Sequence, residues 1–125
     1  MYDVLVQIVR DEFSDIVVGH TIVGRRSAAA LKLRLLVRDG TFVDIWLSMD
    51  ARRYSYHWEQ RAMRGIIHCH DNAPDHPEIA TFPKHFHDGS EEAIKSSLIS
   101  SDPRLAIREF LAFVRARLAE HSSSE

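Results

Sequence analysis

The sequence contains a single cysteine, Cys69, among 125 residues, so the chain cannot form an internal disulfide. No stretch approaches the roughly 20 apolar residues that span a bilayer. The first residues lack the basic start and long apolar run of a secretory signal. These absences exclude a disulfide-stapled secreted domain and a membrane-spanning helix. We therefore predict a cytoplasmic protein with no membrane partner.

Charge of one sign is also not in excess. The formal net charge is -2 and the pI is about 6.4, so the overall field does not favour tight non-specific binding of nucleic acid. Contact with RNA would need a local basic patch, whereas the simpler interpretation is that the basic residues are solvated charges at sheet edges and turns. The candidates are Arg25, Arg26, Lys32, Arg34, Arg38, Arg52, Arg53, Arg61 and Arg64.

Hydrophobic residues make up 45% of the chain and charged residues 27%, as in an ordinary globular protein. The length suits one domain that buries its own core, alone or in a small oligomer. We expect that domain to cover residues 1–121 and a frayed tail to cover residues 122–125.

Two helices are predicted, one near each end of the chain. Leu5, Ile8 and Val9 have helical spacing within the first thirteen residues. Asp102 followed by Pro103 is a typical helix start, and the helix should run to about Ala119. Its apolar stripe comprises Leu105, Phe110, Leu111, Val114 and Leu118.

The residues between these helices are typical of an antiparallel meander. Extended backbone is expected over Ile16–Val23, and alternating apolar residues predict a hairpin from Leu31 to Leu47. Asp39 and Gly40 would both take positive φ in a type I′ turn. Further strands are expected from Arg53 to Glu59, with His57 on the polar face, and over Ile66–Asp71. The fold class is therefore α+β, with about four or five strands and both helices packed on one face.

The stretch HCHDNAPDHPEIATFPKHFH, residues 68–87, contains five of the eight histidines and three of the four prolines. Its prolines forbid regular helix or a central strand. We predict a loop, with at most one short edge strand around Ile79 to Phe82.

Three interpretations of this stretch stay open. Histidine pairs two residues apart project to one side of extended backbone, so His68, His70, His85 and His87 could bind zinc or another divalent metal. Histidines beside arginines could instead exchange protons in metal-free RNA cleavage, which needs no cofactor. In the third, Asn72 and the residues Pro74, Pro77 and Pro83 only stiffen a structural loop. Cys69 is more typical of a small buried residue than of a nucleophile.

Three segments resemble the TumE family of toxin–antitoxin proteins: YSYHWEQ at 54–60, DNAPDHPEIATFP at 71–83 and KHFHDG at 84–89. Their order and separations match the family pattern. Carried over by position, the motif residues are Tyr56, His57, Asp71, Asn72, Pro74, His76, Pro77, Glu78, Phe82, Pro83, His85 and His87. Asp75, Lys84 and Cys69 stand where the family has a histidine, a histidine and a basic residue, which puts activity in doubt at those places.

The resemblance implies a small toxin that is neutralised by a helix-turn-helix antitoxin. Our leading hypothesis is a metal-independent ribonuclease in which His57, His76, His85 and His87 supply acid and base groups with Asp71. Arg53 or Arg61 would meet phosphate. The alternatives are a non-catalytic toxin or partner-binding module with a structural histidine-rich loop, and a metal-dependent hydrolase.

Overall fold

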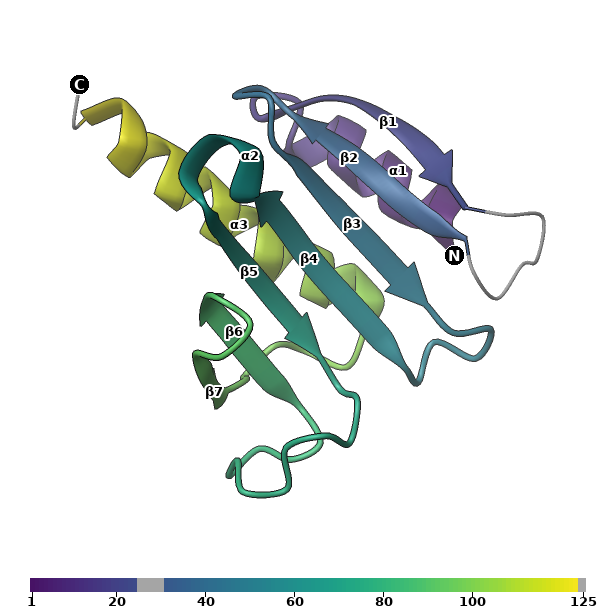
Figure 1. The fold of residues 1–125 in the computed structure, drawn as a ribbon. Helices are drawn as coiled ribbons and strands as arrows, with labels where there is room; N and C mark the ends of the chain where they lie inside the picture. The colour runs from purple at the N-terminus through teal and green to yellow at the C-terminus, as the bar shows by residue number, and fades with distance from the viewer. Residues whose placement is uncertain (25–30, 124–125) are drawn as a thin grey trace.

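The computed structural model describes residues 1–24 and 31–123. Arg25 and Arg26, and residues 124–125 of the tail expected over residues 122–125, lie outside the described residues. Within the described residues, seven antiparallel strands form one sheet in the order β1 to β7, and the two long helices cover one of its faces (Figure 1). The elements are α1 (Tyr2–Glu12), β1 (Val17–Val23), β2 (Lys32–Val37), β3 (Phe42–Leu47), β4 (Tyr54–Gln60), α2 (Arg61–Arg64), β5 (Ile66–Asp71), β6 (His85–Gly89), β7 (Ile94–Ser96) and α3 (Pro103–Ser123).

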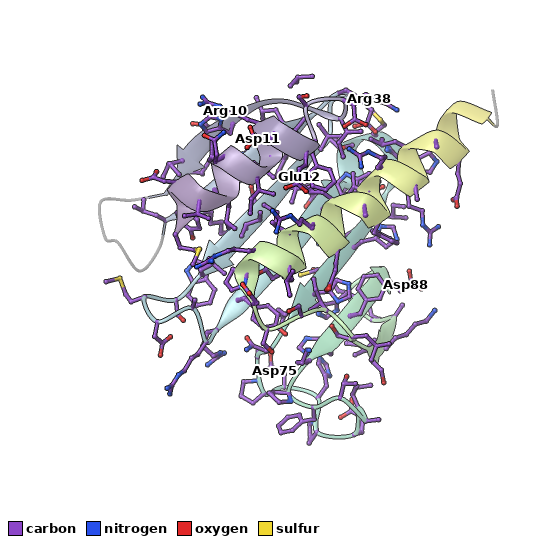
Figure 2. The ribbon with its side chains drawn as sticks, turned by 180° about the vertical axis from the view of Figure 1, so that it is seen from behind. Arg10, Asp11, Glu12, Arg38, Asp75 and Asp88 are labelled. Carbon is purple, nitrogen blue, oxygen red and sulfur yellow. The ribbon has the colours of Figure 1, made fainter. Side chains whose placement is uncertain are left out.

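The core lies between the sheet and the two long helices. Period-two alternation on the strands turns Leu33, Val43, Ile45 and Trp58 toward the helices, and all four are fully buried. Helix α1 contributes Leu5, Ile8 and Val9, as predicted. Figure 2 shows α1 and α3 side by side on this face, and Glu12 of α1 pairs with Arg108 of α3 at 2.8 Å. The other face of the sheet, which we call the open face, is not covered by a described helix.

The expected α+β class and one-sided helices are confirmed, but the expected number of strands was too low. Strands β6 and β7 lie in and just after the stretch predicted to be a loop. Phe86 is the only large apolar residue of β6, and β7 has three residues, so neither has a detectable alternation of apolar residues. The strand expected over residues 79–82 is absent from this described segment, because Ile79 and Phe82 satisfy their N–H groups with the carbonyls of His76 and Ile79 in local turns.

Three smaller expectations also need correction. Of the two described residues Asp39 and Gly40, only Gly40 has positive φ, at 93°, so the turn is not type I′. Residues 38–41 connect the two strands instead, and Val37 N–H donates to Thr41 O at the start of this connection. Leu105 is 49% exposed and lies outside the apolar stripe. Helix α3 extends to Ser123 and so includes the first two residues of the expected tail.

Candidate functional site

The register of β4, β5 and β6 places four of the five predicted catalytic residues in two rows across the open face. Directly opposed residues of antiparallel strands have side chains on the same face. The first row is Ser55, Asp71 and His85, and the second is His57, Cys69 and His87.

Asp71, His85 and His87 form a compact centre, called here the Asp–His centre. Nε2 of His85 lies 3.0 Å from Oδ1 of Asp71, and Nε2 of His87 lies 3.5 Å from Oδ2 of the same carboxylate. The two imidazoles are buried, with 2% and 7% of their residue surfaces exposed. One ligand atom from each of the three residues lies within 4.8 Å of the other two. The structure therefore brings together a carboxylate and two imidazoles that are 14 and 16 positions away in the sequence.

Each imidazole of the centre is also held through its second nitrogen. Nδ1 of His85 lies 3.1 Å from the carbonyl oxygen of Pro83, and Nδ1 of His87 lies 2.9 Å from that of Glu91. A carbonyl oxygen only accepts hydrogen bonds, so both Nδ1 atoms carry protons and donate them. The ring orientations are thereby fixed, and both Nε2 atoms face Asp71.

His76 comes from the loop between β5 and β6, which lies beyond the ends of these strands (Figure 1). Its ring centroid is 4.8 Å from that of His85 and 6.1 Å from that of His87. Asn72 braces the loop, since its Oδ1 accepts from Tyr54 N–H at 3.0 Å and its Nδ2 donates to Arg52 O at 2.6 Å. The described loop also contains Pro74, Pro77 and the cis peptide before Pro83.

A groove of about 500 Å³ lies on the open face beside the Asp–His centre. Ser55 is the cross-strand neighbour of Asp71, and Glu91 holds His87 through its carbonyl, so both residues border the groove and the centre. The lining residues are Lys32, Arg34, Phe42, Asp44, Trp46, Ser55, His57, Glu59, Arg61 and Glu91.

The family model described as Toxin TumE matches residues 5–118. The chain belongs to the TumE family. Comparison with curated proteins gives no match, and comparison with solved structures gives none. None of the described helices is long and apolar enough to cross a membrane.

In this TumE-family chain His57 lies in the groove and not in the Asp–His centre. Neighbouring strands lie about 4.8 Å apart, so two spacings place the backbones of His57 and His87 about 10 Å apart. Nε2 of His57 is 3.2 Å from Oε1 of Glu59. Burial by itself raises the pKa of Glu59. Hydrogen bonds from Arg61 N–H and His57 outweigh that effect and hold this pKa below its ordinary value. Glu59 therefore stays ionised next to His57.

The two predicted phosphate-binding arginines do not lie together. Arg53 precedes β4 and Arg61 follows it, and at about 3.3 Å per residue their backbones are about 25 Å apart. Arg61 pairs with Glu59 at 3.2 Å and with Glu91 at 2.9 Å, and it borders the groove. Arg53 is exposed at the β3–β4 turn. Of the two, only Arg61 is positioned near His57.

The structure does not bring together the four histidines considered for zinc. His68 and His70 oppose Trp58 and Tyr56 on the helix-facing side, where their rings contact Phe113 and Phe110 of α3. Burial lowers the pKa of His70 to about 4 and lowers the pKa of His68 as well. His68 is buried and His70 is half-buried, and both lie on the face opposite His85 and His87.

Two of the three departures from the TumE pattern lie outside the Asp–His centre. Asp75 is exposed at the loop (Figure 2), and Lys84 Nζ donates to the carbonyl of Ile99. Cys69 lies between His57 and His87, where burial raises the pKa of its thiol to about 12. A thiol with that pKa is not a nucleophile near neutral pH. None of the three positions is one of the three residues of the centre, but Cys69 is next to it, with Sγ 4.0 Å from Oδ2 of Asp71.

Sequence reasoning missed Glu91, which joins the groove to the centre. Its carboxylate pairs with Arg61 while its carbonyl accepts from His87. The missed strands explain why, because Glu91 belongs to the short turn between β6 and β7. A hairpin predicted over residues 85–96 would have placed Glu91 beside His87.

Proposed function

We propose that this TumE-family protein is the toxin of a toxin–antitoxin pair and that it cleaves RNA at the open face. The observation that carries the proposal is the Asp–His centre, because a partly exposed carboxylate held between two buried, oriented imidazoles borders a groove that is lined by aromatic side chains and by paired basic and acidic side chains. Perturbed or buried titratable groups that converge at a groove are typical of active sites.

The groove has features that suit single-stranded RNA. Phe42 and Trp46 present aromatic side chains on the open face, where unpaired bases can stack. Arg34 lies over the Phe42 ring at 3.9 Å and is held there by a two-bonded pair with Asp44. Lys32 adds an exposed cation at the same wall. Bases would stack at β3 while phosphates meet Lys32, Arg34 and Arg61.

The chemistry of RNA cleavage needs proton transfer and stabilisation of charge on the phosphate. His57 is the imidazole that lies in the groove itself, and its contact with Glu59 orients its ring for general acid or base work. The Asp–His centre contributes either two further imidazoles or a site for a cation that activates water. Both versions place cleavage where the groove meets Ser55 and Glu91.

A second candidate is a non-catalytic toxin whose histidine-rich loop binds its partner. The observation that favours it is the bracing of Asp71 and Asn72, which hold the loop through bonds to Ala73, Tyr54 and Arg52. In that case the imidazoles serve the shape of the loop. A helix-turn-helix antitoxin is the expected partner under both proposals.

Induced expression in a bacterial host separates the two candidates. The wild type should arrest growth and degrade total RNA, whereas His57→Ala and His85→Ala should do neither and should still co-purify with antitoxin. His20→Ala is the matched control, because His20 is an exposed histidine on β1. Growth arrest with intact RNA in the wild type, or full toxicity of His85→Ala, would contradict the ribonuclease.

A further inference from the structure

We propose that the Asp–His centre is a divalent-metal site, with Asp71, His85 and His87 as its three protein ligands. The donor set of two imidazole nitrogens and one carboxylate suits zinc and neighbouring first-row ions, whereas Mg²⁺ prefers oxygen ligands. This site differs from the four-histidine set considered from the sequence, because it uses Asp71 and excludes His68 and His70.

The hydrogen bonds of the two imidazoles carry the inference. Each Nδ1 is committed as a donor to a backbone carbonyl, which leaves each Nε2 facing the carboxylate of Asp71. The lone pair of an unprotonated Nε2 faces a carboxylate oxygen of Asp71, which is also a hydrogen-bond acceptor, so the two atoms cannot bond to each other. A cation between the three groups satisfies both lone pairs and the carboxylate together.

The distances agree with ligands that share one ion. Zinc binds nitrogen at about 2.0–2.1 Å and carboxylate oxygen at about 2.0–2.2 Å, so two ligands of one zinc ion lie about 3.0–3.5 Å apart. In the centre, Nε2 of His85 is 3.0 Å from Oδ1 of Asp71 and Nε2 of His87 is 3.5 Å from Oδ2, and one donor atom from each residue lies within 4.8 Å of the other two. Histidines that bind metals commonly donate their other ring N–H to a backbone carbonyl, as His85 and His87 do.

Three protein ligands leave a coordination position for water, as in catalytic zinc sites. His76 stands beside the centre, where its ring lies against both histidine ligands. Its Nδ1 is 3.4 Å from Oε1 of Glu78. If the centre held an ion with a bound water molecule, His76 would be the neighbouring imidazole available to exchange a proton with that water. The chemistry that such an ion supplies is activation of water and stabilisation of charge on a phosphoryl oxygen.

The test uses the full chain without an affinity tag. Equilibrium dialysis followed by elemental analysis should give about one Zn²⁺ per chain, and Co²⁺ titration should give visible absorption bands of a bound ion. Asp71→Asn, His85→Ala and His87→Ala should each weaken Zn²⁺ binding by at least about tenfold. His20→Ala and His57→Ala should bind like the wild type, and Mg²⁺ should not compete.

Metal binding is measured without RNA, so the metal site and the proposed ribonuclease activity are tested by different measurements and can be contradicted independently. Circular dichroism of each variant shows whether it is folded, and the wild-type result stands even if a variant is not. Absence of stoichiometric Zn²⁺, Co²⁺, Ni²⁺ and Mn²⁺ binding to the folded wild type would overturn the metal site. Unchanged binding by folded Asp71→Asn and His87→Ala would also overturn it. A metal-binding wild type that leaves RNA intact would instead contradict the ribonuclease.

Discussion

Asp71 and His85 face each other directly across β5 and β6, and their side chains meet at 3.0 Å on the open face of the sheet. The same carboxylate reaches His87, two residues further along β6. Antiparallel pairing thus brings one partly exposed carboxylate and two buried imidazoles together in one centre. The account of function depends on this centre and on the groove beside it.

The packing of α3 gives a prediction about stability. Leu111 is fully buried, whereas Leu105 on the same helix is 49% exposed. Leu111→Ala should lower the free energy of unfolding by about 2–5 kcal/mol because it leaves a cavity. Leu105→Ala should change it by no more than about 0.5 kcal/mol. Urea unfolding of the two variants makes the comparison, and equal losses would contradict the orientation of the helix.

RNA binding should depend on the aromatic wall of the groove. Phe42→Ala removes a ring over which Arg34 lies and on which a base can stack. The loss should be about 1–3 kcal/mol in binding a short single-stranded RNA, since that is the worth of one stacked base. Met49→Ala, at an exposed residue of the β3–β4 turn, is the control. Fluorescence anisotropy measures both, and equal affinities for the two variants would place RNA elsewhere.

Stability should fall as the pH drops from neutral, partly through His68. Burial lowers the pKa of His68 in the folded chain, so the unfolded chain binds a proton first. The contribution of neutral His68 is complete above the unfolded pKa of about 6.5 and is lost as the pH falls through the lower folded value. His68→Gln should therefore show a smaller fall in unfolding free energy between pH 7 and pH 5. His20→Gln should retain the wild-type slope, and identical slopes for all three proteins would reject this role of His68.

Helices and central strands were predictable because their signals are local. Leu5, Ile8 and Val9 repeat with helical period, and Asp102 caps α3 by accepting from Arg104 N–H at 3.0 Å. The β2–β3 hairpin was predictable from its alternating apolar residues. Its turn differs from the expected one, and in it Oδ1 of Asp39 accepts hydrogen bonds from the N–H and the hydroxyl of Thr41.

The site was predictable in its residues and not in its arrangement. His68, His70, His85 and His87 have the same spacing in pairs, so the sequence alone cannot assign the pairs to opposite faces. That assignment depends on the register of β5 against β4 and β6, which pairs His70 with Tyr56 and Asp71 with His85. Strand β6 was not predicted for a different reason, which is that its buried positions hold histidines in place of aliphatic residues.

The most direct measurement is the rate at which the purified protein cleaves a defined single-stranded RNA. Asp71→Asn keeps the size of the side chain and removes its charge, so the account predicts a loss on the order of 100-fold or more. Asp88→Asn is the matched control, because Asp88 follows His87 on β6 and opposes His68 on the other face. Its rate should stay near that of the wild type. Wild-type cleavage by folded Asp71→Asn would contradict the central claim that the Asp–His centre carries the activity.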